Sequence, residues 1–411
     1  MQSIAWIIPM AIKRQWKTGA VKRIQSPMRF YGHLKFLPNL LKMDERIFQF
    51  KAGRPIPEWD LKHRLSIRNP VGPECKDTST IFRINSTYMD VTEQPFRDRQ
   101  WQSGAVLTAC FGALSFLWLA GFMILHPPEE FVATLILPWL VVVLSLGLFV
   151  YIAVRLGRDE FFSLSRRPIR FNRKEKKLYA IRRRRFFAKP GQGDITWEVA
   201  WSENTIFCIH RGYSNYRNTY HIRHYEVDED GNVVRAFSIG RKWEGQECLD
   251  GLLSQWNYWC WYMNHGPEKL PKPLLFFKEK EDMLESFLFC MYDFGMRASA
   301  AYRITMMPFI LFMTCLRLIA LWTCRDPVWP NYVSRVSGIE SGDPYDEPRG
   351  NTPIGWAETT QAINRKDYPD GDKTAMKNWR GEKDALLNAL LWAADTPSLK
   401  EEISKAKTAR P

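Results

Sequence analysis

Histidine, cysteine and acidic side chains are the groups in this sequence that could hold a metal ion or move a proton. His221 and His224 form an HxxH pair, and Cys208, His210 and His265 are the further candidates. An i, i+3 spacing on a strand places two side chains on opposite faces of the sheet, so these two histidines cannot share a metal ion. Ordinary sheet residues are the favoured interpretation, and we expect no metal site and no cofactor.

The sequence also lacks the short motifs of established catalytic chemistry. It contains no Gly-rich phosphate loop, no GxSxG and no HExxH. Asp228, Glu229 and Asp230 are most simply solvated turn residues. The 8 cysteines form no CxxC pair, and several lie in apolar runs, which indicates buried thiols in a reducing compartment. We therefore expect a protein that is not an enzyme.

A strongly basic stretch, RRPIRFNRKEKKLYAIRRRRFF, runs from Arg166 to Phe187 in a chain of net charge +14. Such charge suits nucleic acid, anionic lipid or an acidic protein equally well. The candidates for contact with lipid headgroups or a partner are Arg166, Arg167, Arg170, Arg173, Lys176, Lys177, Arg182, Arg183, Arg184 and Arg185.

Two uncharged runs upstream of this stretch are long enough to cross a membrane. Gly104 to Leu125 and Phe131 to Val154 each suffice for a hydrocarbon core of roughly 30 Å. They predict a transmembrane hairpin over residues 104–154. Arginines flank the hairpin on both sides, whereas its connecting loop carries only Glu129 and Glu130, so both chain ends are expected in the cytoplasm. A basic stretch tethered so close to a membrane does not favour nucleic acid as the ligand.

Beyond the hairpin the hydrophobic period changes to two. Six short strands are predicted at 168–172, 177–182, 196–201, 205–210, 220–228 and 232–240, with a hairpin turn at Asp230-Gly231. An amphipathic helix follows and ends at Gly266-Pro267. The predicted fold class is an α+β membrane protein, in which residues 164–265 form a cytoplasmic antiparallel sheet domain closed by a helix, similar in outline to a pleckstrin-homology domain.

Aromatic residues are dense in that closing helix. Trp256, Trp259, Trp261 and Tyr262 could stack on bases or meet the lipid interface. Adjacent positions on a helix cannot all face one ligand, so packing in the core is the favoured interpretation.

The remaining regions are less regular. Residues 1–77 are expected to be basic and loosely ordered, with Met43 as an alternative start, and residues 78–100 to hold strands close to the membrane. Residues 266–330 include an apolar segment, 304–324, with Arg317 inside it, and an arginine at the centre of a span costs about 2.5–3.5 kcal/mol. We favour an amphipathic helix on the membrane or on the hairpin over a third span. Residues 331–411 are expected to form a polar tail.

The order of these features resembles a family. INSTYMDV precedes the hairpin, RRPIRFNR-x3-KLY follows it, and then come the DG turn, a helix ending in GPEKLP, DPVWPNYV and DPY. From about Phe82 to Tyr345 this order is similar to bacterial membrane proteins with domain of unknown function 6708, although the extension before Met43 departs from it. Members are often encoded beside type VI secretion spike proteins and effectors. The resemblance implies an immunity or accessory role and carries over no catalytic residue.

Two functions remain open. The first is an inner-membrane immunity or accessory protein whose cytoplasmic domain binds a secreted effector or toxin. A simple plug of a basic toxin cleft would need acidic residues, and the sequence offers mainly 228–230 and Glu279 to Asp282. The second is a membrane-anchored lipid-sensing or scaffolding module without a toxin partner, whose basic face meets anionic headgroups.

Overall fold

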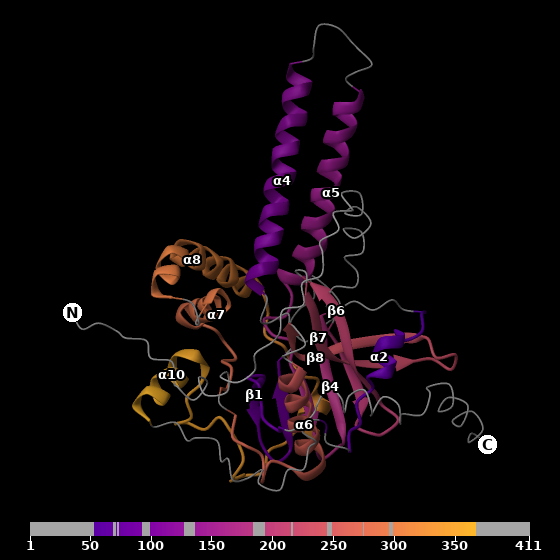
Figure 1. The fold of residues 1–411 in the computed structure, drawn as a ribbon, viewed down its shortest axis with the longest axis vertical. Coiled ribbons are helices and arrows are strands. Elements are labelled where there is room, and N and C mark those ends of the chain that lie inside the picture. Colours follow the sequence, from indigo (N-terminus) through magenta and orange to yellow (C-terminus); the bar gives the residue numbers. More distant parts are fainter. Residues whose placement is uncertain are drawn as a thin grey trace, which may run out of the picture.

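The computed structural model describes residues 53–68, 71, 74–92, 99–126, 136–183, 194–214, 217–244, 249–273, 275–295 and 299–366. These residues form a mixed α+β structure with two antiparallel sheets (Figure 1). The helices are α2 (Glu58–Lys62), α4 (Arg99–Leu125), α5 (Ile136–Glu160), α6 (Leu249–His265), α7 (Met283–Gly295), α8 (Ala300–Thr323), α9 (Asn331–Val336) and α10 (Gly355–Arg365). The strands are β1 (Ile81–Ile84), β2 (Tyr88–Val91), β3 (Ile169–Asn172), β4 (Lys177–Arg183), β5 (Asp194–Ala200), β6 (Ile206–Ser214), β7 (Arg217–Val227) and β8 (Val233–Glu244).

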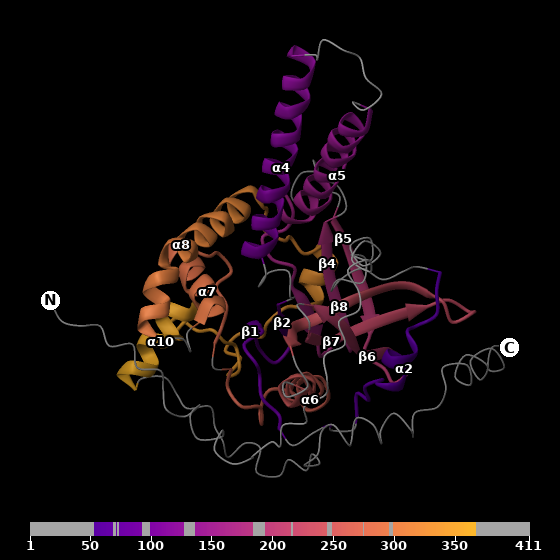
Figure 2. The ribbon, with the colours of Figure 1, turned by 45° about the horizontal axis from the view of Figure 1, so that its top comes forward.

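The two long helices α4 and α5 lie side by side and project away from the strands (Figures 1 and 2). Gly112 lets them approach closely, because a Cβ atom there would lie 2.6 Å from the ring of Phe149. Their outer surfaces are apolar and exposed. Among the described residues, three helices are long and apolar enough to cross a membrane: α4, the part of α5 from Ile136 to Gly157, and α8.

The hairpin is an insertion in a continuous sheet. The five strands of this sheet have the order β1-β2-β3-β4-β5, so β2 before the hairpin pairs directly with β3 after it. Met89 lies opposite Phe171 and Asp90 opposite Arg170. The pairing therefore brings the first residue of α4 and the last residues of α5 to the same edge of the domain.

The six strands expected after the hairpin are present as β3 to β8, but they do not form one sheet. The strands β6, β7 and β8 make a separate sheet of three strands, and β3 to β5 are completed by β1 and β2. Gly231 in the turn before β8 adopts a φ of +83°, as the Asp230-Gly231 signal predicts. A single meandering sheet was expected because strand periodicity does not reveal which strands pair.

Helix α6 packs in a core that contains residues of both sheets. Trp256 and Trp259 are buried against Phe171, Trp201 and Phe207, with ring centroids 5.1–5.7 Å apart in three of these pairs. Gly240 at φ +72° bends β8 over Trp259, and a Cβ atom there would lie 2.6 Å from that ring. Both sheets and α6 thus share one hydrophobic core.

Residues 53–68 differ from the loosely ordered region expected for the N-terminal part of the chain. The Leu65 amide donates to the carbonyl of Phe207, and the Ile209 amide donates to the carbonyl of His63. This segment therefore pairs with β6. Trp256 Nε1 also donates to the Ser66 carbonyl at 3.0 Å, which holds the segment against α6. The backbone of this segment thus forms hydrogen bonds with β6 and α6, which its weakly periodic sequence does not predict.

The C-terminal region also differs from expectation, because the described part of the predicted tail is docked on the domain. Asp346 accepts two hydrogen bonds from the Arg83 guanidinium, at 2.9 and 3.0 Å. Asp343 accepts from both the amide and the hydroxyl of Ser86 at 2.8 Å. Glu347 exchanges backbone hydrogen bonds with Ile84. Residues 343–347 therefore cover the outer edge of β1.

The pairing of β2 with β3 rests on a buried ion pair. The Arg170 guanidinium donates two hydrogen bonds of 2.7 Å to the Asp90 carboxylate and lies over the Tyr88 ring, 3.9 Å from its centroid. We expect Asp90→Ala to lower the free energy of unfolding by about 3–5 kcal/mol, because it leaves a buried guanidinium without its partner. Urea unfolding of the purified protein in detergent measures this change.

An exposed pair gives the matched control. Lys174 Nζ lies 2.6 Å from Glu340 Oε1, and both side chains are solvent-accessible, so Glu340→Ala should cost less than about 1 kcal/mol. Equal losses for the two variants would contradict the assignment of the buried pair as the link between β2 and β3.

Candidate functional site

Several of the basic residues singled out in the sequence have partners within the domain. Arg166 lies 3.1 Å from Glu279, and the Arg173 guanidinium donates to the Ser86 carbonyl at 2.9 Å. Lys176 donates to the Met263 carbonyl at the end of α6, and Lys177 lies 3.3 Å from Glu198.

The rest of this basic set divides between the interior, the strands and the undescribed residues. Arg170 is buried with Asp90 and Arg167 is half-buried. Arg182 and Arg183 end β4, whereas Arg184 and Arg185 lie outside the described residues. The stretch therefore contributes contacts within the domain, and a headgroup or partner role for its exposed members stays a prediction.

The aromatic candidates of α6 lie in or against the core. Trp256, Trp259 and Tyr262 are buried, and the Tyr262 hydroxyl donates to the Asn85 carbonyl at 2.8 Å. Trp261 is half-buried and packs against the same core, with the ring of His265 4.5 Å from its own. Three of the four are thus covered by protein and offer no stacking surface.

The two histidines of the HxxH pair lie on opposite faces of the sheet of β6 to β8. His224 packs between Phe207 and Phe237, whereas His221 lies on the other face with its ring 4.9 Å from that of His210. Asp60 of α2 accepts hydrogen bonds of 2.5 Å from His210 Nδ1 and the Tyr225 hydroxyl. Among the described residues, no group of three or more His, Cys, Asp or Glu side chains could hold a metal ion.

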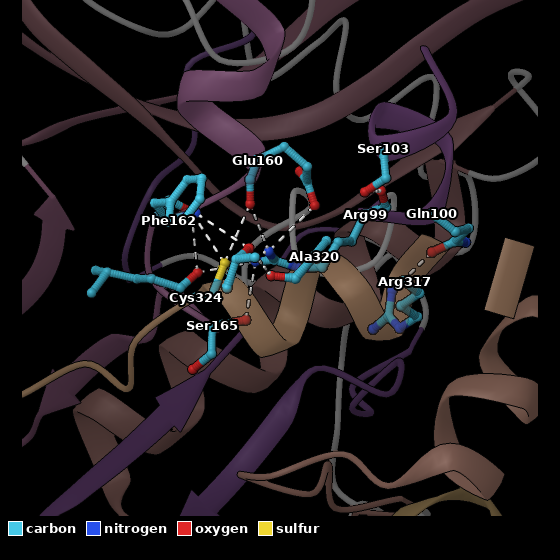
Figure 3. Close-up of polar contacts among 12 residues, drawn as sticks. Arg99, Gln100, Ser103, Glu160, Phe162, Ser165, Arg317, Ala320 and Cys324 are labelled. Carbon is cyan, nitrogen blue, oxygen red and sulfur yellow. Dashed lines mark hydrogen bonds and ion pairs between the residues drawn. The ribbon is translucent and has the colours of Figure 1, made fainter. Parts of the chain in front are cut away.

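A cluster of buried polar side chains lies at the foot of the hairpin (Figure 3). Arg99, the first residue of α4, is buried and forms an ion pair with Glu160 at the end of α5, with Nη1 3.3 Å from Oε1. Its Nη2 donates to the carbonyls of Leu164 and Ser165 at 3.0 and 3.1 Å. Its Nη1 also donates to the Cys324 sulfur at 3.0 Å. One guanidinium thus joins α4, α5, the chain leading to β3, and the end of α8.

A second buried arginine extends this cluster. Arg317, in the C-terminal half of α8, donates from Nε and Nη2 to the Glu281 carboxylate at 2.8 and 2.6 Å and from Nη1 to Gln100 at 2.8 Å. Its guanidinium also lies 4.2 Å from the centroid of the Phe289 ring of α7. Gln100 adjoins Arg99, so the two arginines form one cluster, which we call the polar joint (Arg99, Gln100, Glu160, Glu281 and Arg317).

Burial governs the chemistry of the polar joint. Desolvation raises the pKa of Glu160 to about 7, and Arg99 and Arg167 oppose this rise. Glu160 lies beyond the apolar part of α5, which ends at Gly157. A buried ion pair loses its favourable energy when either partner is removed, because the other charge then stays in a medium of low dielectric constant. The arrangement holds helices together and shows no group aimed at a substrate.

The sequence alone did not predict these ion pairs. The arginines that flank the hairpin, Arg99 among them, were expected to set its topology, and Arg317 was expected to be a costly charge in an apolar segment. Each arginine pairs with a carboxylate that lies beside a different apolar run. Glu160, the partner of Arg99, follows the second run of the hairpin, and Glu281, the partner of Arg317, precedes the run of α7. Opposite charges beside separate apolar runs are the sequence signal that could have indicated these pairs.

The comparisons with known proteins give one match. Residues 146–341 match the model of DUF6708, a family of unknown function. The match begins within α5 and extends to the segment after α9, so it lies inside the region where the sequence order resembles this family. No curated protein and no solved structure matches the chain.

The polar joint predicts a specific pattern of stability changes. We expect Arg317→Met to lower the free energy of unfolding by about 3–5 kcal/mol, because Glu281 stays buried without its partner. The double variant Arg317→Met/Glu281→Leu should recover most of this loss, since an apolar pair can replace a buried ion pair at little cost. Thermal unfolding in nanodiscs measures both.

Lys280 provides the control for this series. Its ammonium lies 3.6 Å from Asp326 and its side chain is 84% exposed, so Lys280→Met should leave the unfolding temperature within error of the unaltered protein. If Arg317→Met behaved like Lys280→Met, the buried pair would not be a determinant of stability.

A neighbouring carboxylate predicts how stability depends on pH. Burial raises the pKa of Glu285 from its ordinary value of 4.5 to about 7, while its carboxylate accepts from the Trp356 amide at the start of α10. Between these two values the folded chain retains a proton that the unfolded chain releases. Stability should therefore fall as pH rises from about 5 to 7, by at most roughly 1.4 kcal/mol per pH unit from this group.

Glu285→Gln should reduce that slope, because the amide cannot titrate but still accepts from Trp356. Urea unfolding at several pH values gives the slope, and Glu358→Gln, at an exposed carboxylate of α10, is the matched control. An unchanged slope in Glu285→Gln would show that this carboxylate does not carry the proton.

Proposed function

We propose that this chain is a bacterial inner-membrane protein that acts as an immunity or accessory protein for a type VI secretion effector. The observation that carries the proposal is the insertion of the hairpin between β2 and β3, with the polar joint at its foot. This construction attaches the strand-rich domain firmly to two candidate spans. A domain so attached can present a binding surface beside the membrane, with both ends of the chain in the cytoplasm.

Protein binding, and not catalysis, is the activity we propose for the domain. Its buried carboxylates have structural partners: Asp60 contacts His210 and Tyr225, Asp90 contacts Arg170, and Glu281 contacts Arg317. These pairs join segments that are distant in the sequence. The match to DUF6708 over residues 146–341 supports the comparison with that family, from which the secretion context of the proposal comes.

The acidic surface available to a basic partner is smaller than the sequence suggests. Glu279 pairs with Arg166, Glu281 is buried against Arg317, and Asp282 accepts from the Glu285 amide at the start of α7. The turn of 228–230 is exposed. We therefore favour a partner that binds away from the run Glu279 to Asp282, in keeping with an accessory role or with binding outside a toxin's active-site cleft.

A lipid-binding module is the second candidate. The sheets and α6 are proposed as a pleckstrin-homology-like domain, and Arg166 and Arg167 follow α5 closely enough to reach anionic headgroups. This candidate differs from the first in needing no protein partner.

Co-expression with the neighbouring open reading frames tests the proposal. We expect the full chain to restore growth to cells that express a toxic neighbour, and the toxin to copurify with the membrane fraction that contains the chain. The chain expressed with an early stop codon is the control. Toxicity that the full chain does not relieve, together with the absence of a copurifying neighbour, would refute the effector-linked role.

Limited proteolysis of the full chain in nanodiscs distinguishes the lipid-binding module from the effector-linked role. The full chain in nanodiscs with and without phosphatidylglycerol should show salt-sensitive protection of the domain from proteolysis only if its basic residues bind headgroups. That result without growth rescue would favour the lipid-binding module.

A further inference from the structure

Helix α8 meets α4 at a steep angle. Arg99, Gln100 and Trp101 are consecutive in the first turn of α4, yet they contact Cys324, Arg317 and Phe309, respectively. These three partners extend over about 22 Å of helix axis at 1.5 Å per residue. Only a helix that lies across the end of α4 can make all three contacts. Figures 1 and 2 accordingly show α8 beside the foot of α4 and not along its length.

The two faces of α8 differ in what covers them. The inner face is buried against α4 and α7 and includes Ile310, Met313, Arg317 and Ala320. The outer face is exposed and, over the fully described helix Ala300–Thr323, carries no charged residue between Arg303 and its end. It consists of Ile304, Thr305, Pro308, Phe309, Leu311, Phe312, Cys315, Ile319 and Trp322. The arginine that makes a third span costly is thus on the protein side.

The outer face continues the apolar surface of the hairpin. Trp101 on α4 is 45% exposed beside α8, and Phe162 just after α5 is 50% exposed. The Phe162 amide reaches the Thr323 hydroxyl at 3.4 Å, so this ring lies next to the end of α8. Because the hairpin surface belongs in lipid, the surface continuous with it is expected to meet the same lipid. Arg303 and Arg325 then flank the helix at both ends, where headgroups can contact them.

We propose that α8 is an in-plane membrane helix, whose outer face lies at the boundary between headgroups and acyl chains on the domain side of the bilayer. It adds a third attachment to the membrane without a third crossing. Through Arg99 and Arg317 it also fixes the angle between the hairpin and the bilayer. This inference does not depend on the identity of any protein partner.

Labels along the outer face test the proposal. An environment-sensitive dye labels cysteines that replace Ile304, Leu311 or Trp322, one at a time, in a Cys110→Ser/Cys248→Ser/Cys315→Ser background, with the chain in vesicles. Native Cys315 is labelled in the Cys110→Ser/Cys248→Ser background. Lipids with spin labels at the headgroup or deep in the acyl chain report depth by quenching. We expect all four labels to show one shallow depth, while a label at Leu117 on α4 is deep.

The alternatives give different patterns. A spanning helix would place the labels at 304 and 322 near opposite surfaces and those at 311 and 315 deep, and a reporter fused after Pro411 would lie outside the cytoplasm. A second copy of the chain covering this face would protect all four labels from lipid quenchers and bring labels on two copies together. Either pattern overturns the proposal. The Cys315→Ser background corrects for the remaining thiols, and unchanged thermal unfolding confirms that each variant is folded.

Discussion

The burial of two arginine–carboxylate pairs at the foot of the hairpin is the constraint on which the structure depends. Arg99 with Glu160 and Arg317 with Glu281 bring four charges out of water, which is tolerable only while every partner is in place. The pairs join α4 to α5 and α8 to the segment before α7, and the two residues of each pair are 61 and 36 positions apart in the sequence, respectively. Because both ion pairs must form at once, they specify one arrangement of these apolar helices, which could otherwise slide against one another.

Strand pairing explains why this constraint can be met. Because β2 and β3 are neighbours in one sheet, the chain must leave the domain and return to it at nearly the same point. The hairpin is thus an insertion whose two ends lie close together, and the first residue of α4 pairs with the last residue of α5. A domain of residues after the hairpin alone would lack β1 and β2, and β3 would lose the partner that holds Arg170. The membrane segment and the sheet are therefore parts of one folding unit.

Much of this architecture could be predicted from local sequence. Runs without charge predicted α4 and α5, and period-two alternation predicted β3 to β8, because both signals depend on neighbouring residues only. The pairing of β2 with β3 and the division into two sheets could not be predicted, since each depends on contacts between distant segments. The same reason explains the docking of residues 343–347 on β1 and the turn after it. Asp343 and Asp346 resemble residues of a solvated tail until Ser86 and Arg83 are placed beside them.

The basic residues show the same limit of prediction from sequence. A high density of Arg and Lys suggested a binding surface, yet Arg170 is buried and Arg166, Arg173 and Lys176 have partners within the domain. A count of basic residues in a sequence treats each of them as available to bind a partner. In the folded domain, several of them instead bind carboxylates or backbone carbonyls of the same chain. The number of basic side chains available to a partner or to lipid is consequently smaller than a count of Arg and Lys in the sequence suggests, although ion pairing within the domain leaves the net charge of +14 unchanged.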